Sequence, residues 1–133
     1  RVSHALAKLG SKGFADRIWE RYDRLDLPRK SEVPYLLNGL GDPKLSDRLA
    51  VILNRGEDHQ LLLGAIEVMA MGEDTKAVAF LRSKIVEWEG KEPAFRESGG
   101  MTAPIIHYSV LRIKAEQACF SIEERVKKPS PAK

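Results

Sequence analysis

The segment Leu36-Leu37-Asn38-Gly39-Leu40-Gly41 is the strongest clue to the architecture, because two similar segments flank it. They are Ala5-Leu6-Ala7-Lys8-Leu9-Gly10 and Glu67-Val68-Met69-Ala70-Met71-Gly72, so the closing glycines recur every 31 residues (41 − 10 and 72 − 41). In each segment, apolar residues stand one and four positions before the glycine. That pattern is typical of a helix that ends on a residue with positive φ, which glycine adopts at little cost. The recurrence predicts repeated units of about 31 residues.

The similarity continues beyond the glycines. The stretch Ala15-Asp16-Arg17-Ile18 lies 31 residues before Ser46-Asp47-Arg48-Leu49, so an Asp-Arg pair followed by an aliphatic residue recurs in register. In the third unit, Ala77-Val78-Ala79-Phe80 keeps the apolar position and lacks the pair.

Apolar residues at helical spacing predict helices throughout, and no segment alternates apolar and polar residues long enough for a strand. The expected helices cover about 14–25, the segment ending near Gly41, a stretch starting at Asp42-Pro43, about 59–71, a stretch starting at Glu73-Asp74-Thr75, and about 103–125. The helix over 59–71 is apolar almost all round, which predicts an interior position between several neighbours. The chain is therefore predicted to be all-α and built from helix pairs.

Two further helices have a predicted inner face. For the helix after Thr75 that face is Ala77, Leu81, Ile85 and Trp88. For the last helix it is Ile106, Val110, Ile113 and Phe120, broadened by Leu111, Ala115, Ala118 and Ile122.

These units resemble HEAT-like repeats, most closely the variety named after the phycobilisome lyases. The matching residues are the segment 5–10, Leu40-Gly41-Asp42-Pro43, and residues 65–74 with the acidic turn Gly72-Glu73-Asp74. The resemblance implies a right-handed α-solenoid of stacked antiparallel helix pairs, usually a surface for docking other proteins. The chain departs from the family where a long insertion replaces the glycine expected near position 103.

That insertion, residues 89–100, is predicted to be a loop. Structureless connections of this length are uncommon within helix pairs and often functional. Phe95 and Arg96 are residue types that dominate interface energetics, which makes them candidate partner-binding residues. The alternative is a tolerated surface insertion whose Phe95 folds back on the core.

Charge argues against a nucleic-acid partner. The net charge is +3, and removing Lys127, Lys128 and Lys133 leaves a neutral body (3 − 3 = 0). We therefore expect a HEAT-like domain over 1–126 and a basic, proline-containing flexible tail over 127–133. Binding of a nucleic-acid backbone is kept as an alternative, because some HEAT-like folds grip duplex backbones with basic concave surfaces, although acidic residues interleave with the arginines that could do so here. These arginines are Arg17, Arg21, Arg24 and Arg48.

Candidate catalytic and metal sites find little support in the sequence. Cys119, the single cysteine, has the apolar neighbours Ala118 and Phe120 and no histidine within one helical turn, so a core position is predicted. His4, His59 and His107 lack the spacing of metal ligands, and His59 is expected in the first turn of its helix. We expect no enzyme activity, cofactor or metal. The longest apolar run, Leu61-Leu62-Leu63, is far too short to span a membrane.

The expected function is a non-catalytic scaffold or docking module for another protein of unknown identity. A non-catalytic subunit of an enzyme complex is a further alternative. The first residue, Arg1, suggests a fragment of a longer chain, and the compartment stays open with the cytoplasm slightly favoured. The second helix of each pair is expected to line a concave binding face, whose exposed polar candidates are Asn38, Gln60, Glu67, His107 and Arg112.

Overall fold

The computed structural model describes residues 13–97 and 107–127, with side chains described over 13–91 and 107–127. Every secondary-structure element in these ranges is a helix, which confirms the all-α prediction. The elements are a helical segment over 13–20, the short 3₁₀ helix η1 (Tyr22–Arg24), α2 (Leu27–Gly39), α3 (Leu45–Arg55), α4 (His59–Ala70), α5 (Thr75–Glu97) and α6 (Tyr108–Lys127).

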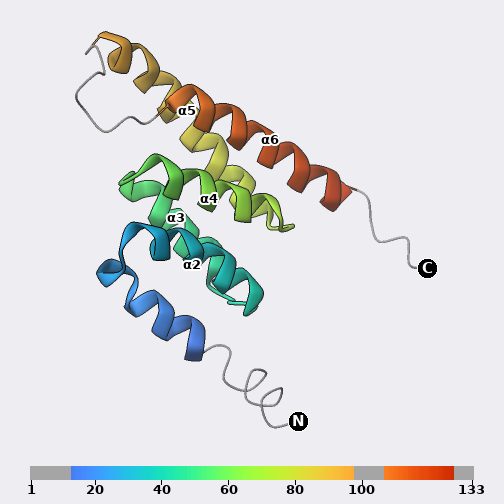
Figure 1. The fold of residues 1–133 in the computed structure, drawn as a ribbon. Helices are drawn as coiled ribbons and strands as arrows, with labels where there is room; N and C mark the ends of the chain where they lie inside the picture. The colour runs from blue at the N-terminus through green and yellow to red at the C-terminus, as the bar shows by residue number, and fades with distance from the viewer. Residues whose placement is uncertain (1–12, 98–106, 128–133) are drawn as a thin grey trace.

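The helices follow one another in space in the order of the chain, from the N-terminal segment to α6 (Figure 1). The central helix α4 contacts α2 on one side and α6 on the other, and it also packs on α3. The most extensive contact between two helices is that of α5 with α6. Packing therefore joins α2 with α3, α3 with α4 and α5 with α6, and α4 lies between α2 and α6.

Helix starts depend on aspartates that accept backbone amide hydrogen bonds. The N-cap Asp26 accepts from the amide of Arg29 at 3.1 Å, and the N-cap Asp58 accepts from the amide of Gln60 at 2.9 Å. The expected start of α5 after Asp74 is confirmed, since its carboxylate accepts from the amide of Lys76. The expected start at Asp42-Pro43 is wrong by two residues. The carboxylate of Asp42 accepts from the amide of Lys44 at 3.0 Å, and the regular helix begins at Leu45.

Only some of the predicted glycine corners have positive φ. Gly41 follows α2 with φ +70°, and the amide of Asp42 donates to the carbonyl of Leu37, as in a glycine-closed helix end. Gly72 does not have positive φ, so the prediction for it is wrong. Its amide instead donates to the carbonyl of Met69 in a tight last turn. Gly10 lies outside the described residues.

The N-terminal helix is shorter than the predicted 14–25. Regular helix ends at residue 20, and η1 follows. Ala15 and Tyr22 are buried, whereas Phe14, which was expected on the apolar stripe, is 52% exposed. This stretch ends at Asp26. The backbone of Asp26 is extended, and its carboxylate caps α2.

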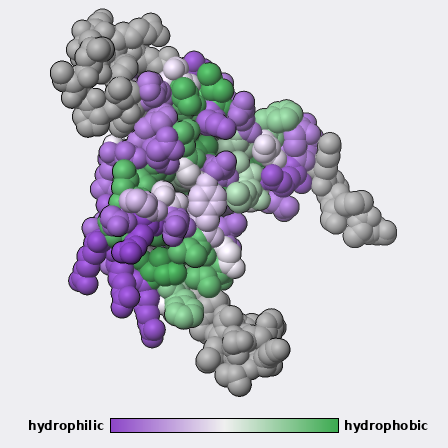
Figure 2. All heavy atoms as spheres, in the orientation of Figure 1, coloured by the Kyte–Doolittle hydropathy of each residue, from purple (hydrophilic) through white to green (hydrophobic). Residues whose placement is uncertain are grey.

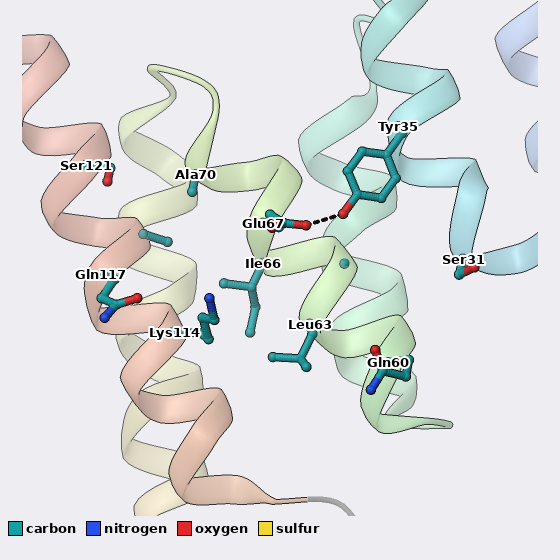
Figure 3. Close-up of a pocket in the computed structure, with 12 residues that line it drawn as sticks. Ser31, Tyr35, Gln60, Leu63, Ile66, Glu67, Ala70, Lys114, Gln117 and Ser121 are labelled. Atoms are coloured by element: carbon teal, nitrogen blue, oxygen red, sulfur yellow. Dashed lines mark hydrogen bonds between the residues drawn. The ribbon is translucent and has the colours of Figure 1, made fainter.

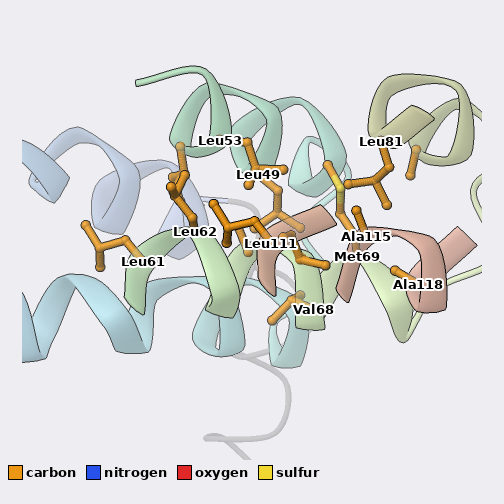
Figure 4. Packing of buried hydrophobic residues seen from close by; sticks show 14 of the residues in the cluster. Leu49, Leu53, Leu61, Leu62, Val68, Met69, Leu81, Leu111, Ala115 and Ala118 are labelled. Carbon is orange, nitrogen blue, oxygen red and sulfur yellow. The ribbon is translucent and has the colours of Figure 1, made fainter. Parts of the chain in front are cut away.

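The core is centred on α4, as the sequence predicted. Leu61, Leu62, Ala65, Ile66, Val68 and Met69 are all buried, and Figure 4 shows several of them facing leucines of α3 and α6. The predicted inner face of α5 is confirmed too, since its four apolar residues are at most 8% exposed. An interior helix between several neighbours accounts for the almost continuous apolar sequence.

The loop predicted over 89–100 is wrong for most of its length. The backbone stays helical through Gly90 and Pro93 to Glu97, so Phe95 and Arg96 belong to α5. Beside Gly90, Lys91 pairs with Glu87 at 3.1 Å, and its ammonium lies 5.5 Å from the ring centroid of Tyr108 on α6. These contacts favour the helix over this turn despite the glycine. Gly99 and Gly100 lie outside the described residues.

The inner face predicted for the last helix is wrong for Val110, Ile113 and Phe120 and is confirmed for the residues predicted to broaden it, Leu111, Ala115, Ala118 and Ile122. Val110, Ile113 and Phe120 are 40%, 47% and 65% exposed, while Leu111, Ala115, Ala118, Cys119 and Ile122 are buried. The two small alanines let the backbone of α6 approach its neighbours closely, which favours this stripe. The helix α6 begins at Tyr108, and Ile106 lies outside the described residues.

The last described helix extends into the predicted tail. It includes Lys127, which was expected in the tail, and residues 128–133 lie outside the described ranges. Figure 2 shows apolar side chains reaching the surface in several places between hydrophilic ones. No helix in the described part of the chain is long and apolar enough to cross a membrane.

Candidate functional site

A groove of about 630 Å³ lies on the side of the molecule formed by α2, α4 and α6. The helix α4 runs between the other two, which form the two walls (Figure 3). The lining residues are Ser31 and Tyr35 from α2; Gln60, Leu63, Gly64, Ile66, Glu67 and Ala70 from α4; and Lys114, Gln117, Ala118 and Ser121 from α6. Three helices that are far apart in the sequence thus supply one site.

Helical spacing places these residues along the groove. Gln60, Gly64, Glu67 and Ala70 follow one another at three- and four-residue intervals, so they share the outward face of α4. The groove is open because residues with small side chains lie where α2, α4 and α6 come close together. At Gly64 a Cβ atom would lie 3.9 Å from the ring of Tyr35, so the tyrosine occupies the space beside the bare backbone.

Tyr35 and Glu67 join two sides of the groove. The hydroxyl of Tyr35 on α2 donates a hydrogen bond to the carboxylate of Glu67 on α4 (Figure 3). This bond, and burial to a smaller extent, raises the pKa of Tyr35 to about 12. The phenol therefore stays protonated at neutral pH and acts as a fixed donor.

Four lining residues have unused hydrogen-bonding capacity. No other described residue forms a hydrogen bond or an ion pair with the side chains of Gln60, Lys114, Gln117 and Ser121. The groove thus offers two amides, one hydroxyl and one ammonium to a partner, beside the small apolar surfaces of Leu63 and Ala70.

The structure brings together two of the polar residues expected on the binding face, Gln60 and Glu67. Asn38 is exposed beyond the groove, where its side-chain nitrogen lies 3.7 Å from the sulfur of Met71. Arg112 is half-buried and pairs with Glu116 at 3.4 Å. His107 precedes α6 and does not line the groove.

His107 instead contacts His59 at the start of α4. The backbone amide of His107 donates to Nδ1 of His59 at 3.3 Å, and the two rings meet edge to face at 5.2 Å. Burial lowers the pKa of His59, the nearby His107 lowers it further, and Asp58 acts in the opposite direction. His59 is in the first turn of α4, as predicted.

Tyr35, Lys114, Gln117 and Ser121 line the groove but were not predicted from the sequence. The last three follow a helical i, i+3, i+7 pattern on α6, a signal that the sequence does contain. It was overlooked because the apolar stripe of Val110 and Ile113 was taken as the inner face. For Phe95 and Arg96 the structure places only the backbone, in α5.

One of the four arginines considered for nucleic-acid binding is buried. Arg48 is 8% exposed and donates to Asp42 at 2.9 Å and to Asp16 at 2.5 Å, so it is not available to a phosphate. Arg17, Arg21 and Arg24 are exposed at the N-terminal end, where Figure 2 shows hydrophilic side chains beside apolar ones.

Cys119 belongs to the core, as predicted. It is 1% exposed, and its sulfur lies 3.8 Å from the carbonyl oxygen of Val78. Burial raises the pKa of the thiol, which disfavours a reactive thiolate. In the described ranges, no three His, Cys, Asp or Glu side chains are close enough together to hold a metal ion.

No family model, curated protein or solved structure matches this chain.

Proposed function

We propose that this chain is a non-catalytic docking module for another protein and that the α2–α4–α6 groove is its binding site. The observation that carries the proposal is the groove itself, an open site of about 630 Å³ lined by the alternate helices α2, α4 and α6, with polar groups that have no partner among the described residues. Open, mixed polar and apolar surfaces of this kind suit recognition of a polypeptide.

We also propose that the scaffold is a HEAT-like α-solenoid. Equivalent helix ends support it: α2 ends at Gly39 and α4 at Ala70, a spacing of 31 residues (70 − 39). The aspartates Asp42 and Asp74 each accept a hydrogen bond from the amide two residues later. The right-handed sense of the array is implied by the family resemblance alone.

Contacts between the proposed units point the same way. Several side-chain bonds join residues 28 to 33 positions apart, as expected when each unit stacks on the next. They include Tyr35 with Glu67, Ser46 with Asp74, Arg48 with Asp16, Arg55 with Asp23, and Lys84 with Asn54. A solenoid of this kind has an extended face on which a partner can lie.

Site-specific photo-crosslinking tests the docking role. A diazirine amino acid replaces Gln117 in the groove or Val86, which is 69% exposed on α5, and each protein is irradiated in lysate of the source cells. We expect a discrete adduct from position 117 alone, reduced by excess unlabelled wild-type protein. Circular dichroism checks that each variant is folded.

Two groove-filling variants identify the site. Ala70→Phe and Ser121→Trp should abolish the adduct, whereas Ala79→Phe, at an exposed position on α5, should leave it unchanged. Equal adducts from positions 117 and 86, or adducts that survive both groove-filling substitutions, would contradict the proposal.

A further inference from the structure

The groove has the length of a short extended peptide. Its floor on α4 runs from Gln60 to Ala70, ten residues that rise about 1.5 Å each and so span about 15 Å. An extended chain advances about 3.3 Å per residue, so four to five residues cover roughly that distance.

The polar side chains of the groove that have no partner among the described residues suit a partner in an extended conformation better than a helical partner. Each amide, of Gln60 on α4 and Gln117 on α6, offers a donor and an acceptor, the same pair that a peptide unit presents. A helix satisfies its own backbone and needs a broad apolar floor. Here Ile66 is only 1% exposed, and Leu63 is half-buried, so the apolar contact available to a helix is small.

The charges in the groove are few and separated. Lys114, on the α6 wall, is the lining cation, and among the described residues it has no ion pair. Glu67 is the lining carboxylate, and it accepts the hydrogen bond of Tyr35 on the α2 side. One cation and one carboxylate cannot attract a nucleic-acid backbone, which requires several clustered cations. They can, however, select a single acidic side chain beside α6.

We propose that the groove binds an extended polypeptide segment whose acidic side chain pairs with Lys114, while Gln60 and Gln117 hold its backbone. This inference rests on the proposed docking function and names the chemistry of the partner. Because Lys114 stands on the α6 wall and the carboxylate of Glu67 on the floor is bonded to Tyr35 of α2, the acidic residue of the segment faces α6 and not α2.

Titration of the ¹⁵N-labelled full chain with three capped peptides tests the inference by NMR. The peptides share the sequence Ser-Ala-Val-X-Val-Ala-Ser, in which X is Glu, Gln or Lys. We expect the Glu peptide to shift the amide signals of Gln60, Lys114 and Gln117 in a saturable manner. The Gln peptide should bind about two- to fivefold more weakly, the size expected for one partly exposed ion pair.

Charge variants make the assignment specific. Lys114→Gln should remove the difference between the Glu and Gln peptides, and Lys114→Glu should reverse the preference toward the Lys peptide. Lys76→Gln, at an exposed position outside the groove, should keep the wild-type preference. Equal binding of all three peptides, or a preference for Glu that survives in Lys114→Gln, would overturn the inference.

The two proposals fail in different ways. If photo-crosslinking from position 117 gives a groove-dependent adduct and no peptide shifts the groove signals, the docking role stands and the extended acidic segment is rejected. If neither experiment detects binding at the groove, both proposals are rejected.

Discussion

At the scale of single residues, the groove exists because certain side chains are small. Gly64, Ala70 and Ala118 stand where larger residues would fill the space between α4 and its neighbours. Glycine inside a helix costs about 1 kcal/mol relative to alanine. A Cβ atom at Gly64 would lie 3.9 Å from the ring of Tyr35, an ordinary van der Waals distance, so the tyrosine could still donate to Glu67 beside an alanine.

Tyr22 gives a prediction about a buried hydroxyl. Its side chain is 1% exposed, and its hydroxyl has no hydrogen-bond partner among the described residues. Burial is the main reason that the pKa of this phenol rises to about 12. Tyr22→Phe removes an unsatisfied polar group, so we expect the free energy of unfolding to rise by about 1 kcal/mol in urea denaturation.

Tyr35→Phe is the matched control, because that hydroxyl is bonded to Glu67. Its loss should lower the free energy of unfolding by about 0.5 kcal/mol, at the low end for a hydrogen bond since the site is exposed. A loss of stability in Tyr22→Phe as large as that in Tyr35→Phe would contradict the prediction.

At the scale of elements, helix boundaries and helix faces have different origins. The start of α4 and the end of α3 follow from adjacent residues, since Asp58 caps α4 and Gly56, with φ +58°, ends α3. The inward face of α6 does not. Its sequence has two apolar stripes, and contact with α4 and α5 selects the one containing Ala115 and Ala118.

The contact between the starts of α4 and α6 predicts a pH-dependent stability. Nδ1 of His59 accepts from the amide of His107, which requires a neutral imidazole. The pKa of His59 is below its ordinary 6.5 in the folded chain, so the unfolded chain binds the proton more readily. The stabilising effect is complete above that ordinary value and is lost as the pH falls below it.

Urea denaturation at about pH 7.5 and about pH 5.5 measures this effect. His59→Asn keeps an acceptor near the position of Nδ1 and removes the titration, so its stability should fall less between the two pH values. Asp74 and Glu87, whose pKa values are lowered by hydrogen bonds from Ser46 and Lys84 respectively, lose their contributions only in more acidic solution. Identical pH dependence in the variant and the wild type would exclude His59 as the cause.

At the scale of the whole molecule, a buried ion network links the first helices. Arg48 on α3 reaches Asp16 on the N-terminal segment and Asp42 in the turn before α3. The arginine of the second Asp-Arg pair in the sequence thus bonds to the aspartate of the first pair. Ala79, which stands 31 residues after Arg48, cannot form such a bond to Asp47.

Arg48→Met should therefore destabilise the whole fold. It leaves the Asp42 carboxylate, 1% exposed, without its counter-charge, a change that costs about 3 kcal/mol. We expect the urea midpoint to fall while the transition stays cooperative. Arg82→Met, which removes the exposed pair with Glu123, is the control and should have a much smaller effect. Equal effects of the two substitutions would show that the network is unimportant for stability.

The sequence by itself determined the all-helical class, the burial of α4 and Cys119, the inner face of α5, and the helix starts at Asp58 and Asp74. These features are encoded by neighbouring residues, because caps and helical periodicity act over a turn or two of chain.

Only the tertiary structure decided the face of α6, the helical course of 89–97, and the groove. For a helix with two apolar stripes, the two possible inward faces are close in local free energy. For a segment that contains Gly90 and Pro93, helix and loop are close in local free energy. Contacts between residues distant in the chain, such as Lys91 with Tyr108 on α6, select among them. The groove follows the same rule, since Tyr35, Glu67 and Lys114 meet only when α2, α4 and α6 pack side by side.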